Sequence, residues 1–507
     1  MASEHHHSSL GILKNAAYSF TTWFLPLILG FVATPVIIRK LGDESYGLYA
    51  LVLGFVGYSF NLNLGRAITA YVASNETKTD LRERDEIISS SLQLSFLVGF
   101  VGLVSIVLLS GWLSRDVYRL GALVEDGSFS LKLAGIIVFV SILTNLLWSA
   151  IQGLHRFDVF AKLSNLNGIS LVVLNLVLVL SGFKVKAIFV GNLIVAVVVC
   201  LASLFAARKL IPDFRFRRKV GGSLFLKVLA FNGGVVGYQL SANALLLFER
   251  GAIVRFRDPD SLAHYVVAMM MGLYLHAFIA SVALVLFPLS SSLKNDKEKL
   301  KALYLKAMKA VSVPIVFIAV SLVVQRELFL TVWLGRSYAD EAGTVLAIHV
   351  AGFALLASQI VVWQMVEGLG YPQYNFLTAL GALVVSLPLM YLFLPIYGLE
   401  GAAVARFAGS LLIFSVTFIA ERVVFGNVEF RFWLSLLGKL GLAGSLSGLI
   451  QWSLRSLVPG NWAGFLLLLT AGGIAFVLTL MIVRFLRREE LDWLSRFFAK
   501  REAFSGE

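Results

Sequence analysis

The chain has little charge and almost no cysteine. Only 14% of its 507 residues are charged, whereas 58% are apolar; an ordinary soluble domain carries about 25% charged residues. A soluble fold with so few charges could not cover its own surface. The same numbers exclude disordered, collagen-like, coiled-coil and disulfide-rich chains. They predict a polytopic helical membrane protein.

Several functional motifs are also missing. The single cysteine, Cys200, excludes an internal disulfide, and the sequence has no Cys/His spacing typical of a metal site. It has no phosphate-binding Gly-x-x-x-x-Gly-Lys-Ser/Thr motif. All predicted loops are short, which leaves no room for a soluble catalytic domain. We therefore expect a transporter without catalytic residues, metal or cofactor.

Apolar runs long enough to cross a bilayer, which requires about 20 residues per helix, are frequent. Fourteen spans are predicted, at 13–38, 46–74, 87–110, 131–153, 159–181, 185–207, 224–249, 262–290, 302–325, 339–368, 374–394, 398–420, 434–456 and 461–486. Residues 1–12 resemble an N-terminal tail or tag, because they contain His5-His6-His7, and are excluded from site reasoning.

The basic residues indicate the orientation, because Lys and Arg collect in cytoplasmic loops. With the N-terminus inside, the inner segments hold 28 of the 43 basic residues and the outer loops hold 13. Both termini are therefore predicted to be cytoplasmic. The net charge of +13 is explained by this excess of Lys and Arg in the inner segments. Nucleic-acid binding is therefore not expected.

An internal duplication is the most informative feature. Trp148 to Leu154 matches Trp363 to Leu369, and Glu44-Ser45 with Tyr49 matches Asp260-Ser261 with Tyr265. The matching segments are separated by a stretch of sequence that contains about six predicted spans. Because six is an even number of crossings, both halves enter the membrane in the same direction. Two parallel six-helix lobes around a central cavity are an architecture of transporters that work by alternating access.

The duplication divides the chain. The predicted segments are the N-lobe 13–207, a basic cytoplasmic linker 208–222, the C-lobe 223–421, two extra C-terminal helices 422–486, and a cytoplasmic amphipathic tail 487–507.

Two arginines lie inside spans, where a charge costs several kcal/mol and requires a partner or a watery cavity. Arg66 has Asn63 on the same helix face, and Arg406 lies eight residues into its span. Since guanidinium binds phosphate bidentately, both are candidate contacts for an anionic substrate. The alternative is a structural ion pair or membrane anchoring for Arg66, and a local structural pair for Arg406.

Polar residues also follow one stripe of the seventh span. Asn232, Gln239 and Asn243 are spaced by seven and four residues, which suits a cavity wall, or else polar contacts between helices. Arg250 and Arg39 add positive charge toward the outer side of the predicted path.

Four residues are candidates for ion coupling. Glu249 is an intramembrane acid, although its neighbour Arg250 favours a simple ion pair. His276 is a candidate proton shuttle, as is His349, but a lone membrane histidine is more often just hydrogen-bonded. Glu367 adds an acid toward the inner end. Coupling to a proton gradient, a sodium gradient or the membrane potential is expected.

A motif series near the N-terminus points to a family. It comprises Leu13-Lys14-Asn15, Pro35, Arg39-Lys40-Leu41-Gly42, Tyr46-Gly47-Leu48-Tyr49, Asn63-Leu64-Gly65 and Tyr71-Val72-Ala73. This stretch resembles the Wzx-type flippases, the polysaccharide-transporter branch of the multidrug/oligosaccharidyl-lipid/polysaccharide exporter superfamily.

The resemblance implies a flippase of the bacterial inner membrane. Its substrate would be an undecaprenyl-diphosphate-linked oligosaccharide, a precursor of O-antigen, capsule or exopolysaccharide. Membrane lipid, a polysaccharide polymerase and a chain-length regulator are the implied partners, and the protein is expected to be a monomer. In the lipid II flippases of the superfamily, the two extra helices form a groove for the lipid tail.

Other functions remain open at this point. A cation-coupled multidrug exporter would require a buried acid in an N-lobe helix. The centres of the first six spans contain no acidic residue. A lipid II flippase is a further alternative. A membrane glycosyltransferase or polymerase would require catalytic acids, which Asp43-Glu44 in the first outer loop could mimic.

Overall fold

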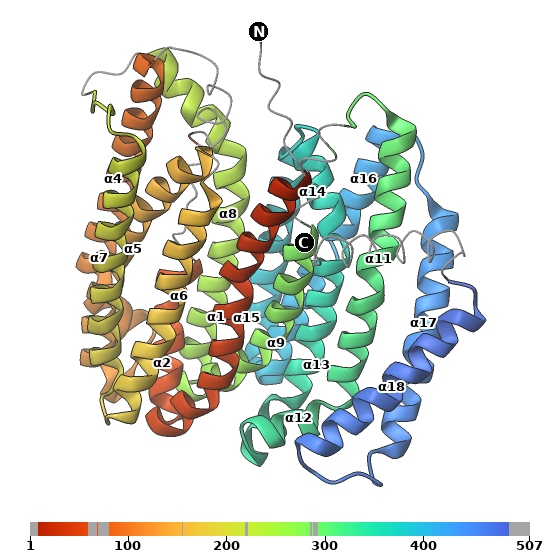
Figure 1. Cartoon of the computed structure of the whole chain (residues 1–507). Helices are drawn as coiled ribbons and strands as arrows, with labels where there is room; N and C mark the ends of the chain where they lie inside the picture. The colour runs from red at the N-terminus through yellow and green to blue at the C-terminus, as the bar shows by residue number, and fades with distance from the viewer. Residues whose placement is uncertain are drawn as a thin grey trace, which may run out of the picture.

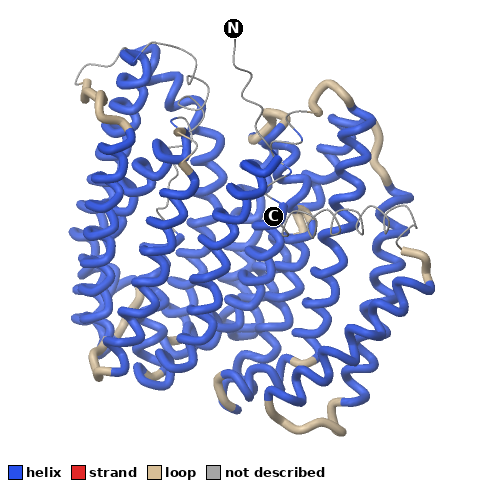
Figure 2. Tube along the Cα trace, in the orientation of Figure 1, coloured by secondary structure: helices blue, strands red, loops and turns tan. Residues whose placement is uncertain are grey.

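The computed structural model describes residues 9–58, 68, 81–154, 156–217, 222–283, 286, 290 and 293–485. These residues form helices joined by short turns, with no β-strand among them (Figure 2). Within them, 11 helical segments are long and apolar enough to cross a membrane. The longest, Gln373–Phe425, contains 53 residues, which is enough for two crossings.

The first group of helices corresponds to the predicted N-lobe. It comprises α1 (Ser9–Leu41), α2 (Asp43–Leu53) continuing into η1 (Gly54–Tyr58), α4 (Leu81–Trp112) continuing into η2 (Leu113–Val117), η3 (Gly121–Leu123), α5 (Val124–Gly153), α6 (Phe157–Leu180) and α7 (Val185–Leu210). In this group α1 packs on α6, while α5 packs on both α4 and α7 (Figure 1).

The second group corresponds to the predicted C-lobe. It comprises α8 (Gly222–Phe256), α9 (Pro259–Ala283), α11 (Lys297–Val324), α12 (Arg326–Trp333), α13 (Arg336–Ser358), α14 (Ile360–Gly368), α15 (Gln373–Ser410) and α16 (Ile413–Phe425). Here α9 packs on α13, and α8 packs on α15. The last two helices, α17 (Phe430–Leu454) and α18 (Trp462–Ile482), pack on each other beside α11, at one edge of the molecule (Figure 1).

Local sequence determines several helix ends. Gly398 has φ 63°, which breaks α15 into two helices and accounts for the two crossings of this segment. Gly426, with φ 84°, ends α16 in the left-handed conformation. Asp296 and Asn461 cap α11 and α18 by accepting hydrogen bonds from the backbone N–H groups of Lys299 and Gly464, each at 3.1 Å.

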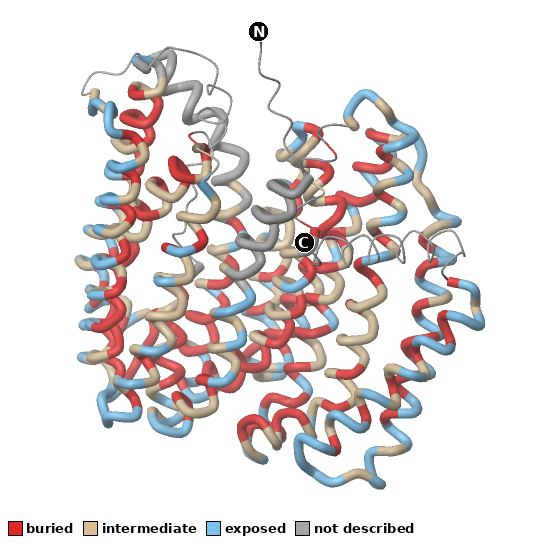
Figure 3. Tube along the Cα trace, viewed as in Figure 1, coloured by how far each residue is buried: buried red, intermediate tan, exposed pale blue. Residues whose placement is uncertain are grey.

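The outer faces of the helices are apolar. Leu434 on α17 and Ile482 on α18 are 77% and 80% exposed, and Leu108 on α4 and Phe205 on α7 are similarly bare. Buried positions lie instead on the sides where helices meet (Figure 3). So much exposed apolar surface is stable only in lipid, so the chain is a multi-pass membrane protein.

The two groups meet at the end of the molecule that carries the turn at Gly42, hereafter the Gly42 end (the lower end in Figure 1). There α2 packs against the start of α9, and a Cβ at Gly47 would lie 1.6 Å from the carbonyl oxygen of Pro259. In addition, Phe31 of α1 stacks on Trp333 of α12 with ring centroids 4.8 Å apart. Its carbonyl oxygen accepts a hydrogen bond from the Trp333 indole N–H at 3.1 Å.

A buried carboxylate fixes the position of α17. Glu421 of α16 is fully buried and accepts hydrogen bonds from the Tyr304 hydroxyl at 2.6 Å, the Trp433 indole N–H at 2.8 Å and the Glu429 backbone N–H at 2.8 Å. These donors come from α11, from α17 and from the turn before α17, so one side chain holds three elements together.

The contact at Gly47 gives a stability prediction. Gly47→Ala places a methyl group against a proline backbone that cannot rotate away, so α2 and α9 must separate. We expect a loss of about 1–3 kcal/mol, typical of overpacking, measured as a lower Tm of the purified protein in detergent. Gly102→Ala is the matched control because a Cβ there meets open space. Equal Tm values for the two variants would contradict the close approach.

Candidate functional site

The charged residues that the sequence singled out in the C-lobe form a buried pair. Arg406, on the second part of α15, donates a hydrogen bond from a guanidinium nitrogen to one carboxylate oxygen of Glu249 on α8. The other carboxylate oxygen accepts a hydrogen bond from the Tyr265 hydroxyl of α9. Glu249 and Tyr265 are fully buried, and Arg406 is 9% exposed. Three helices of one lobe therefore share a single charged cluster.

Aromatic rings enclose this cluster. The guanidinium carbon of Arg406 lies 5.1 Å from the ring centre of Phe353 on α13, a cation–π contact. The buried His349, also on α13, meets Tyr265 edge-on with ring centres 4.6 Å apart. The rings exclude water from the pair, which strengthens the attraction between its charges but makes the loss of either partner costly.

The pairing differs from the simple pair of Glu249 with its neighbour Arg250 that the sequence favoured. The structure pairs Glu249 with Arg406 instead, 157 positions along the chain. Adjacent residues on a helix point in different directions, so the two side chains diverge. The alternative for Arg406 was a local structural pair; the structure shows an ion pair, but with a residue of another helix.

Arg250 reaches across to the other lobe. Its guanidinium donates a hydrogen bond to the carbonyl oxygen of Ala50 in α2, and both residues are buried. Its Cδ lies 3.0 Å from the position that a Cβ at Gly54 would take. The glycine thus makes room for the arginine, and a cation of one lobe is bound to the backbone of the other.

The first acidic turn takes part in the same boundary between the lobes. The Tyr338 hydroxyl of α13 donates to a carboxylate oxygen of Asp43 at the start of α2, and the Tyr338 ring lies 4.3 Å from that of His264. Asp43 therefore has a structural contact between lobes, which is not the placement required of a catalytic acid.

The remaining candidates for substrate binding are Arg66, Asn63, Asn232, Gln239, Asn243 and Arg39. Arg66 and Asn63 lie outside the described residues, as does the side chain of Asn232. Gln239 and Asn243 are half-buried on α8, and Arg39 is exposed at the end of α1.

The other candidates for ion coupling do not join the cluster of Glu249. His276 of α9 is half-buried, with its ring 6.5 Å from that of Phe353. Glu367 is half-buried near the end of α14, in the turn region opposite the Gly42 end. In the part of the chain that the structure describes, no three His, Cys, Asp or Glu residues gather as metal ligands would.

Two members of the charged cluster could be tested together. Glu249→Gln or Arg406→Gln alone leaves an uncompensated buried charge, which costs about 3–5 kcal/mol. The double variant carries no such charge, so its Tm in detergent should lie above that of either single variant. Arg336→Gln, which breaks an exposed pair with Asp340, should leave Tm nearly unchanged. Additive losses in the double variant would show that the two side chains do not interact.

Comparison with solved structures identifies the fold. The chain is similar to a lipid II flippase, MurJ, in an inward closed conformation, with a TM-score of 0.72, 15% identity, and coverage of 92% of this chain and 99% of that one. It is also similar to an inward-facing multidrug resistance MATE family transporter of the MOP superfamily, with a TM-score of 0.68, 16% identity, and coverage of 81% and 98%. Both have the same all-helical membrane fold.

Comparison of sequences identifies the family. A Shigella flexneri protein named "Putative O-antigen transporter" is 23% identical over 403 residues, which cover 78% of this chain and 94% of that protein. The model of the family described as "Polysaccharide biosynthesis protein" matches residues 36–342, which is more than half of the chain. The chain therefore belongs to this polysaccharide biosynthesis family and is a transporter of the flippase type rather than an enzyme.

Proposed function

We propose that the protein moves an undecaprenyl-diphosphate-linked oligosaccharide repeat unit across the bacterial inner membrane. The observation that carries the proposal is the similarity to the "Putative O-antigen transporter" over 94% of that protein. The exposed apolar surface supports a substrate whose lipid tail stays in the bilayer. Further support comes from the arginines placed along the predicted path, since guanidinium groups bind phosphates well.

The proposed mechanism is alternating access. Beside the packing of α2 on α9, the contacts between lobes at the Gly42 end include a few hydrogen bonds and ring contacts, centred on Arg250, Asp43 and Phe31. A hydrogen bond to a charged group contributes about 1.5–3 kcal/mol, so a small set of such contacts can form and break during transport. Separation of the lobes at this end would expose the guanidinium of Arg250 to the path.

Arg406 has a different part in this proposal. Its charge is neutralised by Glu249 in the present conformation, so an anionic diphosphate would compete with that carboxylate for it. Protonation of Glu249 would release Arg406 for the substrate, which makes Glu249 the preferred candidate for coupling to a proton gradient. A sodium gradient or the membrane potential would act through the same charges.

The remaining parts of the proposal concern the setting in the cell. Both termini are placed in the cytoplasm, with the Gly42 end outside, on the basis of the basic loops. A polysaccharide polymerase and a chain-length regulator are the proposed protein partners of a monomeric flippase.

The two extra helices favour a lipid substrate over a drug. The match to MurJ covers 92% of this chain, and the residues before Phe430 make up a smaller share, so the match includes part of the C-terminal segment that contains α17 and α18. A lipid II flippase is accordingly the second candidate, and lipid II belongs in the same assay.

Transport can be tested in proteoliposomes that contain a fluorescent undecaprenyl-diphosphate oligosaccharide. The wild-type protein should speed exchange between leaflets, and Arg66→Ala and Arg406→Ala should slow it at least about ten-fold, the effect of losing one charge-assisted contact. Exchange of lipid II but not of the oligosaccharide lipid would favour the second candidate. If both variants retain wild-type rates, the cationic path is wrong.

Alternating access can be tested by cross-linking the lobes. Asp43→Cys with Tyr338→Cys, in a Cys200→Ser background, places two thiols on side chains that touch across the boundary. A short reducible thiol cross-linker should stop exchange, and a reductant should restore it. Arg336→Cys with Asp340→Cys, within one helix, is the matched control and should transport at an unchanged rate. Undiminished exchange by the cross-linked protein would contradict the mechanism.

A further inference from the structure

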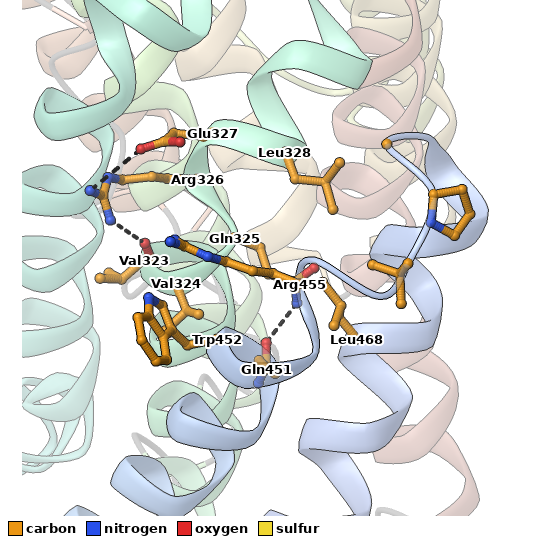
Figure 4. A pocket seen from close by; sticks show the side chains of 13 residues that line it. Val323, Val324, Gln325, Arg326, Glu327, Leu328, Gln451, Trp452, Arg455 and Leu468 are labelled. Atoms are coloured by element: carbon orange, nitrogen blue, oxygen red, sulfur yellow. Dashed lines mark hydrogen bonds and ion pairs between the residues drawn. The ribbon is translucent and has the colours of Figure 1, made fainter.

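A pocket lies on the far side of the C-lobe from the boundary between lobes. It has a volume of 410 Å³ and is bordered by the end of α11, the start of α12, the end of α17 and the turn before α18 (Figure 4). It lies where these helices end, the level at which lipid headgroups meet a membrane protein. Arg326, Arg455 and Glu327 are its charged lining residues.

An apolar groove continues from this pocket along α11 and α17. The groove has a volume of 740 Å³ and shares Val323, Val324 and Trp452 with the pocket. Gly441, Gly444 and Gly448 of α17 line it, and a Cβ at Gly444 or Gly448 would touch valines of α11. The pair of cavities thus forms one site, polar at the helix ends and apolar toward the middle of the bilayer.

The polar part of the site has a small positive charge. Arg455 lies over the Trp452 ring at 5.1 Å, and Arg326 donates to the carbonyl oxygen of Val323 at 3.0 Å, with Glu327 3.9 Å away. Figure 4 shows the side chains of both arginines extending to the edge of the pocket where Trp452 lies. Two arginines and one glutamate leave a net charge of +1, which matches one phosphodiester.

A buried amide in the pocket has an unused acceptor. Gln325 is 3% exposed and donates from its amide nitrogen to Gln451 at 2.6 Å. Its own side-chain oxygen accepts no hydrogen bond within the described part of the chain. A buried carbonyl oxygen without a donor costs about 1–3 kcal/mol, so a ligand hydroxyl at this point would be stabilised.

We propose that this site binds one anionic glycerophospholipid of the phosphatidylglycerol type. Its phosphate interacts with Arg326 and Arg455, a hydroxyl of its headgroup donates to Gln325, and an acyl chain lies in the groove between α11 and α17. Guanidinium groups bind phosphate oxygens through charge-assisted hydrogen bonds. A polyprenyl diphosphate fits less well, because it has more than one negative charge and no headgroup hydroxyl next to its first phosphate.

The proposal is independent of the transported substrate, since it concerns binding alone. Full-length protein in mild detergent is titrated with phosphatidylglycerol, phosphatidylcholine or undecaprenyl diphosphate, and binding is measured by native mass spectrometry. The wild-type protein should retain one phosphatidylglycerol in preference to the other two lipids. Arg326→Gln with Arg455→Gln should weaken that binding at least about ten-fold, whereas Arg336→Gln should leave it unchanged.

A second pair of variants tests the groove without changing charge. Gly441 lines the groove and Gly438 lies one turn earlier on α17; a Cβ at either position meets open space. Gly441→Leu fills the groove and should weaken phosphatidylglycerol binding several-fold, while Gly438→Leu should bind like the wild type. This pair remains informative if the double arginine variant fails to fold.

Three results would overturn the proposal. The first is unchanged phosphatidylglycerol binding in a folded double arginine variant. The second is equal binding by the two glycine variants. The third is preferential retention of undecaprenyl diphosphate that depends on Arg326 and Arg455, which would make this a site for the polyprenyl lipid.

Discussion

The absence of water in the bilayer is the constraint on which this structure depends. A polar group inside the membrane must find its partner within the protein, and two buried acids, Glu249 and Glu421, do so from several helices at once. Glu249 joins α8, α9 and α15, whereas Glu421 joins α16, α11 and α17. The charges that are costly to bury are therefore also the points at which the helices are held in register.

The fold could be predicted from sequence to a large extent, because its main signals are local. Apolar length predicted most of the crossings found in the described residues, and the duplication predicted two similar halves. The matching segments that contain Tyr49 and Tyr265 turn out to lie on α2 and α9, the helices that pack together at the Gly42 end. Their tyrosines have different partners, since Tyr265 donates to Glu249 and Tyr49 accepts from Asn175. The repeat conserves the position of the side chain but not the contact.

The contacts of the site were less predictable, because they join residues far apart in the chain. Sequence proximity suggested Glu249 with Arg250, but helix geometry directs those side chains apart. Glu421 was missed altogether, although an acid one residue beyond a predicted span was an available signal. The break of α15 at Gly398, by contrast, agrees with the division between the predicted spans 374–394 and 398–420.

The attachment of α17 to the C-lobe has a consequence for how the protein moves in its membrane. Glu421 at one end of this helix, and Gln451 near the other, bind it to the C-lobe through α16 and α11. The terminal helix pair, α17 and α18, is thus attached to the C-lobe at its periphery. When that lobe tilts, the pair tilts with it and displaces lipid. Bilayer thickness and lateral pressure act on this helix pair and therefore change the relative free energies of the conformations. The same protein in a thicker membrane would favour a different balance between its conformations.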